Sequence, residues 1–251
     1  MLYGMYISAA GAMANSYRQD VITNNLANID TAAFKKDLAL FNARPTEAAM
    51  NGSARMTSAL LENTGGGIFA LPTYTDFSQG SLEQTGSAFD VALIEDGFFQ
   101  VQKGDQTMFT RDGRFMVGAD GTTLVTVTGQ LPVLNAEGET ISLLPGITPK
   151  IDNNGYISQD GQAITKIGTV SFQDNSQLKK IGNNLYEGEI RQATPSTIQL
   201  RQGYIESSGV NAMDEITNMI KTQRLFQNNV TMLQIQDQTL GAAISKLGNI
   251  R

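Results

Sequence analysis

The N-terminal part of the chain has a helical pattern of apolar and small residues. These positions alternate between steps of four and three, which predicts a helix with one seam for a partner. The seam consists of Tyr3, Ile7, Ala10, Ala14, Tyr17, Val21 and Asn24. Between Met1 and Phe34 the only charged side chains are Arg18, Asp20 and Asp30. Because an exposed helix normally carries more charge, we expect this helix to be covered on several sides.

The C-terminal segment carries a longer seam with the same period. Ten successive positions keep strict three–four spacing, which predicts a coiled-coil helix. They are Ile216, Met219, Gln223, Phe226, Val230, Leu233, Asp237, Leu240, Ile244 and Leu247. The polar members Gln223 and Asp237 would set the register at a cost in stability. Asn211 is placed to cap the helix, which would pair with the N-terminal helix or with a neighbouring copy.

The middle of the chain has the pattern of an antiparallel β-domain. Short apolar or β-branched runs alternate with turns such as Asp112-Gly113 and Asp160-Gly161. Glycine supplies the positive φ that such turns need. In the run Phe98-Phe99 we expect one ring to face the core.

These patterns together predict an α+β protein in which paired terminal helices form a coiled-coil core domain. The N-terminal helix takes residues 1–36, and the C-terminal helix takes residues 202–251. A β-rich outer domain occupies residues 76–201. Residues 37–75 form an irregular connector, which is unusually long for a compact domain. We therefore expect this connector to be an extended arm that becomes ordered against its neighbours.

Composition and charge argue against several classes of function. The net charge is −6 and no basic cluster occurs, which argues against a nucleic-acid partner. Cysteine and histidine are both absent, which removes the commonest general base and most zinc sites. Asp152-Asn153-Asn154-Gly155 lacks the glycine and glutamate spacing of a calcium loop. We expect no enzymatic activity, no cofactor and no metal.

The charged share of the chain bears on its surroundings. Charged residues make up 17%, against about 25% in typical soluble proteins. This suits a surface that is largely buried against copies or partners, since burying a charge is costly. No apolar run approaches the ~20 residues of a membrane span, and residues 1–7 lack the positive start of a signal peptide. Any export is expected to proceed without a cleaved Sec-type signal.

Motifs from one end of the chain to the other resemble those of a single family. Residues 22–35 contain an Asn-Asn-apolar-Ala-Asn core, followed by threonine, an aromatic residue and a basic residue. Residues 203–210, with Met219-Ile220 and Gln223-Arg224 beyond them, match a second terminal motif. Further matches lie at residues 78–82, 90–92, 96–99, 110–113 and 182–186. In this order, the motifs resemble those of the flagellar rod and hook proteins.

The chain departs from the family pattern at two positions. Ala33 stands where the family usually has glycine, and Gly209 stands where it usually has asparagine. A glycine at position 33 would allow a left-handed exit from the helix. We therefore expect the local turn to differ in this chain.

The resemblance implies a structural subunit of the bacterial flagellar basal-body rod, the axial drive shaft for motility. It implies an inner tube of paired terminal helices with the β-domain outside. The expected partners are homologous rod subunits, further copies of the chain and the flagellar type III export apparatus, with no insertion into a membrane. The expected location is the periplasmic rod of the basal body. Free subunits are expected to have disordered ends, because an isolated seam cannot bury its apolar face.

The residues expected to carry assembly come from both terminal helices. The apolar seam members are Tyr17, Val21, Ile216, Phe226, Val230 and Leu233. The polar members that would set register are Asn24, Asn25, Asn28, Gln223 and Arg224. A simple C-terminal cap of the first helix is an equally good explanation for the asparagine cluster.

Several alternatives remain open on sequence alone. Within the family that the motifs resemble, distal rod subunits tend to have a longer connector and hook subunits a larger outer domain. The compact length and the connector, which is short by that standard, favour a proximal rod subunit over a distal rod or hook-type subunit. A cell-wall-binding β-module with coiled-coil ends is a rival, although tryptophan is absent and aromatic residues make up only 7%. A peptidoglycan hydrolase would need a carboxylate pair that the sequence does not single out.

Overall fold

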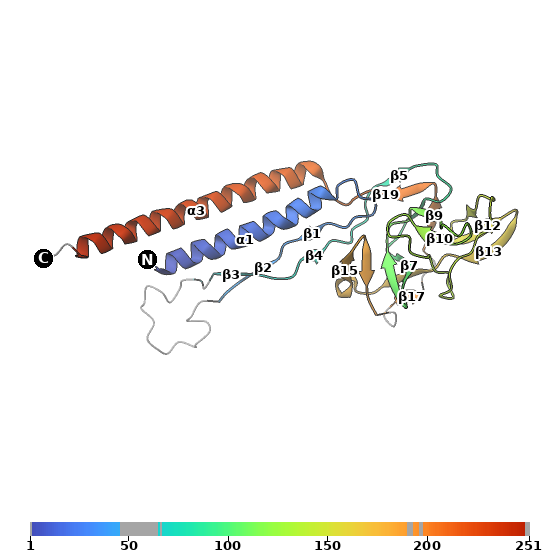
Figure 1. Ribbon diagram of the computed structural model, residues 1–251, viewed down its shortest axis with the longest axis horizontal. Coiled ribbons are helices and arrows are strands. Elements are labelled where there is room, and N and C mark those ends of the chain that lie inside the picture. The colour runs from blue at the N-terminus through green and yellow to red at the C-terminus, as the bar shows by residue number, and fades with distance from the viewer. Residues whose placement is uncertain (1, 46–64, 66, 190–192, 196–197, 249–251) are drawn as a thin grey trace. The chain divides into compact units, whose positions relative to one another are not determined.

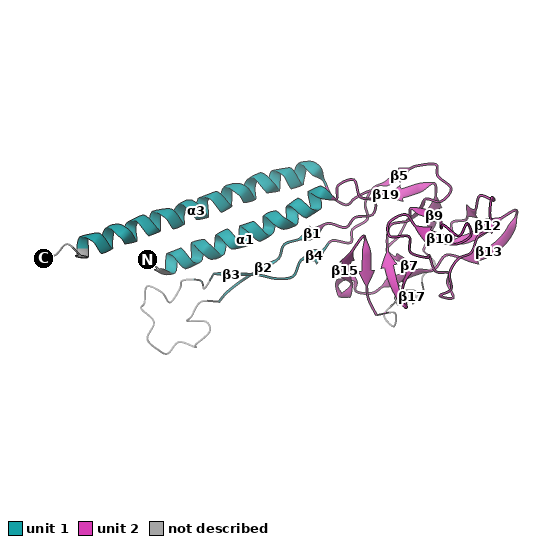
Figure 2. Cartoon of the chain, in the orientation of Figure 1, with its two compact units in different colours: residues 1–27, 37–75, 211–251 teal, residues 28–36, 76–210 magenta. Residues whose placement is uncertain are grey.

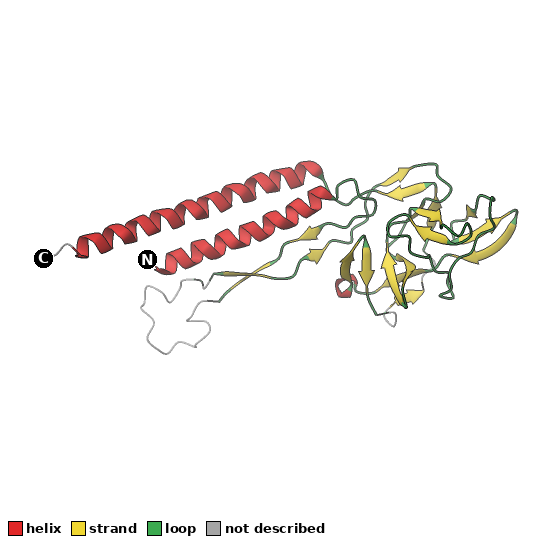
Figure 3. Cartoon of the chain, in the orientation of Figure 1, coloured by secondary structure: helices red, strands yellow, loops and turns green. Residues whose placement is uncertain are grey.

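The computed structural model describes residues 2–45, 65, 67–189, 193–195 and 198–248. The chain divides into two compact units, coloured separately in Figure 2. The helical unit comprises residues 1–27, 37–75 and 211–251, and the β unit comprises residues 28–36 and 76–210. Figure 3 shows both long helices in the first unit and most strands in the second, so the protein is α+β as expected.

Two long helices dominate the helical unit. α1 (Leu2–Ala27) and α3 (Ala212–Gly248) lie side by side and run in opposite directions (Figure 1). The Asn211 side chain caps α3, because its Oδ1 atom accepts a 3.0 Å hydrogen bond from the backbone N–H of Met213. Neither helix contains a proline that would interrupt its hydrogen bonds.

An extended arm accompanies α1 within the helical unit. Its outgoing segment holds β1 (Asp37–Leu38) and β2 (Phe41–Ala43). Its returning segment holds β3 (Ile68–Ala70) and β4 (Tyr74–Thr75), which pair antiparallel with β2 and β1 respectively. Within the described residues the expected irregular connector is therefore a pair of short ladders, while residues 46–64 and 66 of it lie outside the described part.

The β unit is built around a six-stranded antiparallel sheet. The order of its strands is β15-β16-β8-β7-β14-β17. In that order the strands are Lys179–Gly182, Leu185–Glu187, Gln106–Thr110, Phe98–Lys103, Thr169–Phe172 and Ala193–Pro195. A short 3-10 helix, η1 (Asn175–Gln177), follows β14.

Smaller antiparallel ladders complete the described part of the β unit. A three-stranded sheet is formed by β11 (Lys150–Ile151), β12 (Tyr156–Gln159) and β13 (Gln162–Lys166). Two-stranded ladders join β9 to β10, β6 to β18 and β5 to β19. These six strands are Phe115–Val117, Leu124–Thr126, Val91–Leu93, Leu200–Gln202, Leu82–Gln84 and Tyr204–Glu206.

Two adjacent phenylalanines on β7 supply two separate parts of the core. Side chains of neighbouring strand residues point to opposite faces of a sheet. Phe99 therefore packs with Val101 in the larger apolar cluster, whereas Phe98 packs against Phe77 and Tyr186. Both rings are fully buried, so the expectation that only one of them faces the core is wrong.

The segment after α1 turns sharply into the β unit. The helix ends at Ala27, and the backbone N–H of Thr31 donates to the carbonyl of Asn28 to form a turn. Ala33 adopts a φ of 55° although it is not glycine. Its burial and a 2.7 Å hydrogen bond from its N–H to the carbonyl of Glu206 hold it there. The expected change of turn caused by alanine is therefore not seen, since Ala33 takes the left-handed conformation itself.

Candidate assembly surface

The contact between α1 and α3 is centred on glycines that face long amide side chains. A Cβ atom added to Gly4 would lie 2.9 Å from Nε2 of Gln236. A Cβ atom added to Gly11 would lie 3.1 Å from Nδ2 of Asn229. The two glycines of α1 are seven positions apart, and so are Asn229 and Gln236 of α3. Seven residues is the period of a heptad seam. The glycines therefore let two bulky polar side chains enter between the helices.

The same heptad row of α3 continues toward its N-terminus with polar residues. Thr222 and Glu215 are both buried. Beside this row, Nε2 of Gln19 donates a 2.8 Å hydrogen bond to Oε1 of Gln223. The centre of the helix pair is therefore polar, and apolar side chains flank it.

The predicted seam of α3 is only partly turned toward α1. Phe226, Leu233, Gln223 and Val230 are half-buried, as expected of seam residues. Four further members of the predicted seam or of its polar set are exposed: Ile216, Arg224, Asp237 and Ile244. The side chain of Leu247 lies outside the described residues. The contact row thus runs through Thr222, one residue before the predicted row through Gln223.

The predicted seam of α1 contacts the arm on one side. The Tyr17 hydroxyl donates to the carbonyl of Leu71 at 3.4 Å, and its ring meets Phe41 edge-on with centroids 6.2 Å apart. Tyr3 donates in the same way to the carbonyl of Gly65 at 2.6 Å. Val21 is buried. The row through Tyr3 and Tyr17 therefore packs on the arm, a neighbour that the periodicity did not reveal.

The asparagine cluster is divided between several local roles. Asn25 is buried and holds the start of the arm from both sides, since it donates to the carbonyl of Asp37 and accepts from its N–H, each at 2.9 Å. Asn24 is exposed. Asn28 lies in the β unit, where its carbonyl accepts a 3.0 Å hydrogen bond from the Ser208 hydroxyl. These contacts organise the chain's own backbone at the end of α1.

The outer surface of the helical unit is rich in apolar side chains. On α1 and α3 the exposed members are Tyr6, Met13, Met213, Ile216, Ile220, Leu225, Met232, Ile235 and Ile244. On the arm they are Leu38, Leu40, Ile68, Phe69, Leu71 and Tyr74. Met13 retains 74% of its accessible surface and Met213 retains 73%. Exposed apolar surface on this scale marks an interaction surface.

A groove of about 350 Å3 opens between α1, β1 and α3 within the helical unit. Its apolar lining includes Val21, Ile22 and Leu225. Its polar lining includes Arg18 and Glu215. The groove therefore offers both an apolar surface and charged groups to an incoming side chain.

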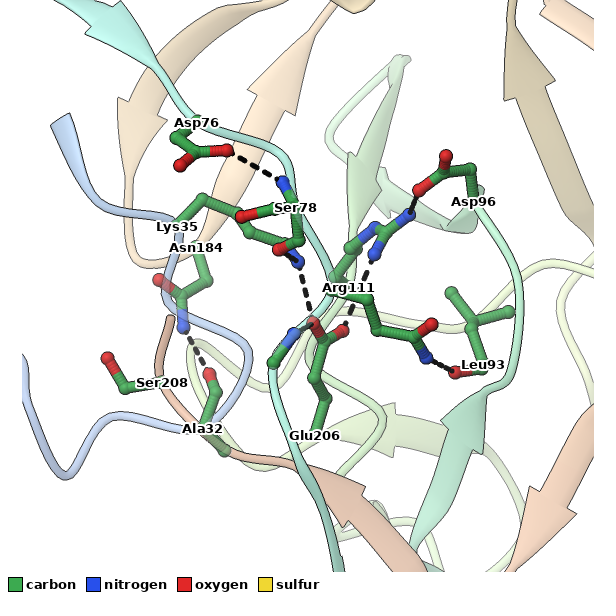
Figure 4. Close-up of polar contacts among 12 residues, drawn as sticks. Ala32, Lys35, Asp76, Ser78, Leu93, Asp96, Arg111, Asn184, Glu206 and Ser208 are labelled. Carbon is green, nitrogen blue, oxygen red and sulfur yellow. Dashed lines mark hydrogen bonds and ion pairs between the residues drawn. The ribbon is translucent and has the colours of Figure 1, made fainter. Parts of the chain in front are cut away.

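The β unit contains a buried cluster of charged side chains (Figure 4). Nζ of Lys35 lies 2.6 Å from Oε1 of Glu206, and Nη1 of Arg111 lies 3.6 Å from Oε2 of the same carboxylate. Nη2 of Arg111 also meets Oδ1 of Asp96 at 2.9 Å. The side chains of Lys35, Arg111 and Glu206 are almost wholly buried, whereas that of Asp96 is 78% exposed. Glu206 is thus the buried counter-ion of two cations.

The cluster joins the segment that follows α1 to the strand that precedes α3. Lys35 belongs to residues 28–36 and Glu206 ends β19. Burial, and then the nearby charge of Arg111, hold the pKa of Lys35 below its usual value, although Glu206 acts in the opposite direction. Sequence reasoning missed this cluster, although Lys35 and Glu206 both lie within the two terminal motifs.

Membrane-spanning helices and clusters of metal-ligating side chains are both absent from the described residues. No described helix is long and apolar enough to cross a membrane. Within the same residues, no group of three or more acidic side chains is arranged to hold a metal ion. The arrangement of side chains is that of a contact surface and a buried structural junction.

Known proteins resemble the chain at its ends and over nearly its full length. Residues 5–35 match the family described as flagella basal body rod protein, and residues 201–246 match the flagellar basal body rod FlgEFG protein C-terminal family. One relative, the flagellar basal-body rod protein FlgG of Buchnera aphidicola subsp. Schizaphis graminum, is 34% identical, with 96% of this chain and 98% of that protein aligned. FlgG of Bacillus subtilis is 33% identical over 96% of this chain and 97% of its own. FlgF of Caulobacter vibrioides is 30% identical over 98% of both chains.

The fold and these relatives define a structural protein and not an enzyme. The chain belongs to the flagellar basal-body rod protein family. It is a structural rod subunit of the flagellar basal body that assembles with other rod subunits. Membership of this family does not favour the alternative function of a cell-wall-binding β-module with coiled-coil ends. Relatives of both the FlgG and FlgF kinds match the chain.

Proposed function

We propose that this rod subunit assembles through its helical unit, with copies of itself as well as with homologous subunits. The observation that carries the proposal is the contrast between the polar contact of α1 with α3 and the apolar outer surface of both helices. A helix pair that exposes Met13, Met213 and Ile220 gains free energy when other subunits cover them.

We further propose that α1 and α3 pair as an antiparallel coiled coil. The seven-residue spacing of Gly4 and Gly11, matched by that of Asn229 and Gln236, supports this geometry. In the assembled rod such pairs would line an inner tube, with the β unit outside as a spacer and contact surface. The assembly residues are then those on the outer faces of the pair, with Arg224 among them.

The proposal includes export through the flagellar type III apparatus to the periplasmic rod, without a cleaved signal. The expectation of export rests on the resemblance of the terminal motifs to those of the flagellar rod and hook proteins. Mass spectrometry of the subunit from purified basal bodies is expected to find the peptide that contains Leu2. Its consistent absence would contradict export without cleavage.

We place the chain in the proximal rod, next to the distal rod, on the basis of its compact length and short connector. A distal rod or hook-type position in the same axial structure is the alternative. Electron microscopy of basal bodies from a deletion strain tests both the class and the place. Loss of the rod beyond the inner-membrane ring is expected, whereas an intact rod that lacks only the hook would contradict a proximal position.

Leu233→Asp tests helix pairing and assembly together. Leu233 is half-buried on α3, so an aspartate there would place a charge among apolar side chains. We expect the variant to be absent from basal bodies and the cells to be non-motile. Leu144→Asp is the matched control, because Leu144 is exposed in the β unit. Normal motility with Leu233→Asp would contradict the proposal.

A further inference from the structure

α3 extends past the N-terminal end of α1 (Figure 1). Gly4 lies beside Gln236 and the two helices are antiparallel, so the start of α1 at Leu2 lies level with Gln238. α3 continues to Gly248, which is about 15 Å further at about 1.5 Å per residue. The face of α3 that contacts α1 therefore continues beyond the end of its partner.

The contact face of α3 changes from polar to apolar where α1 ends. Opposite α1, its heptad row holds Asn229 and Gln236. Seven positions further the row reaches Ala243, and the apolar side chains of Leu240 and Ile244 lie beside it. Ile244 retains 62% of its accessible surface. We call Leu240, Ala243 and Ile244 the C-terminal patch, because the contact with α1 that covers the earlier part of this face has ended there.

A second apolar patch lies at the other end of α3 and faces away from α1. Met213, Ile216 and Ile220 follow three–four spacing, which places them on one face of the helix, and all three are exposed. Ile220 precedes the contact residue Thr222 by two positions, or about 200° of helical rotation. We call these three residues the N-terminal patch, and it is turned away from the side of α3 that α1 occupies.

The two patches suit one another but cannot meet within one chain. Both are apolar, and each is as narrow as one face of a helix. Ile216 and Ile244 are 28 positions apart, or about 42 Å along α3. A second copy is therefore needed to bring one patch onto the other.

The charges at the two ends of α3 favour contact between unlike ends. The first turn carries Asp214 and Glu215, and the last turn carries Lys246. Asp214 and Lys246 are both exposed. Two first turns side by side would bring carboxylates together, whereas a first turn beside a last turn brings opposite charges together. The ends of α3 are therefore complementary in charge as well as in apolar surface.

We propose that the C-terminal patch of one copy packs against the N-terminal patch of a second copy, so that their α3 helices overlap head to tail. The proposal rests on assembly through the helical unit, and it specifies which faces meet. Covering Ile244, Met213 and Ile220 removes apolar surface from water on both sides of the contact. Because the two patches are different surfaces of one chain, a copy bound through one patch still offers the other to a further copy. Such a heterologous contact extends as a helical filament when its rotation does not close a ring.

Ile244→Asp tests the contact, and Ser245→Asp is its matched control. Ile244 is mostly exposed in the free chain, so its replacement should leave the thermal denaturation of the free chain unchanged. In the rod it would place an unpaired carboxylate among apolar side chains, and we expect the amount of subunit in purified basal bodies to fall by more than about tenfold. Ser245→Asp adds the same charge to the same exposed turn, about 100° away round the helix, and should be incorporated as well as the unaltered chain. Equal losses for the two variants would overturn the proposal.

A failure of this contact is distinguishable from a failure of the proposed function. If the unaltered chain were missing from basal bodies, the proposed function would fail and the contact with it. If the unaltered chain is present and Ile244→Asp is incorporated equally well, only the head-to-tail contact is overturned.

Photocrosslinking identifies what covers the C-terminal patch. In isolated basal bodies, p-benzoylphenylalanine in place of Ile244 forms a covalent bond with whatever lies beside it. We expect mass spectrometry to find it joined to the tryptic peptide of residues 202–221, which contains the N-terminal patch. The separation of about 42 Å along α3 means that this peptide must come from a second copy. A crosslink to α1, to another C-terminal patch or to a different protein would overturn the proposal, as would incorporation without any crosslink.

Discussion

The two units place polar and apolar side chains in opposite ways. In the β unit, Val101 and Ile167 are fully buried beneath the strands. In the helical unit, polar Thr222 is buried at the helix contact, whereas Met13 and Met213 are mostly exposed. The β unit therefore has the distribution of a domain that folds alone, and the helical unit has the distribution of an element that awaits partners.

This difference assigns separate sources of stability to the two units. A domain with a closed apolar core gains its folding free energy within one chain. Two helices joined through glycine–amide contacts gain little from apolar burial and depend on what covers their outer faces. Removing a buried interaction of the β unit should therefore lower its free energy of unfolding in the free chain. Removing a helix contact should instead act mainly on assembly.

The largest effect is expected at the buried charge cluster. Glu206→Ala would leave Lys35 and Arg111 buried without their shared counter-ion, which should lower the free energy of unfolding of the β unit by about 3–5 kcal/mol. Urea denaturation followed by near-ultraviolet circular dichroism measures this loss. Asp96→Ala is the control, since its partner contact is mostly solvated and should be worth less than about 1 kcal/mol. Equal losses for both variants would contradict the role of Glu206.

An intermediate effect is expected at the glycine contact. Gly11→Leu would force a side chain into the space of Asn229, at a cost of about 1–3 kcal/mol to the helix pair. Gly241→Leu is the matched control, because an added Cβ there meets no atom within 4 Å. That control should instead favour the helix by up to about 1 kcal/mol. Helical content is measured by far-ultraviolet circular dichroism in assembled subunits and should fall for Gly11→Leu only. An equal fall for Gly241→Leu would contradict a specific packing role of Gly11 against Asn229.

The smallest effect is expected where α1 leads into the β unit. Ala33→Gly would relieve a left-handed backbone that costs alanine about 1–2 kcal/mol, less the extra entropy of glycine in the unfolded chain. We expect a net gain of about 0.5–1 kcal/mol in the free energy of unfolding of the β unit. A loss of stability, measured by thermal denaturation, would show that the methyl group of Ala33 contributes more than its backbone strain removes.

The sequence predicted the kinds of elements better than their contacts. The three–four spacing identified both helices and the half-buried positions of Phe226 and Leu233. The spacing placed the contact row of α3 one residue too late in the chain. Thr222 and Glu215 are polar, so a search for apolar periodicity does not identify them as contact residues. Both line a groove whose other walls come from α1 and β1, distant segments of the chain that a local pattern does not reach.

The charge cluster and the arm were hidden for a related reason. Lys35 and Glu206 stand in recognisable motifs, but neither is apolar, and their pairing joins distant segments. Tyr17 was recognised as an apolar contact residue, yet the arm that covers it has no periodic pattern. Phe98 and Phe99 were identified as strand residues, whereas the existence of two core faces required the sheet itself.

The central claim is that assembly, and not the free chain, stabilises the helical unit. Hydrogen exchange of the full chain, measured free in solution and again in isolated basal bodies, tests this most directly. We predict that backbone amides of α1 and α3 in the free chain exchange more than about tenfold faster than those of β7 and β8, and that the helices become protected in the basal body. Helices protected as strongly as β7 and β8 in the free chain would contradict the account.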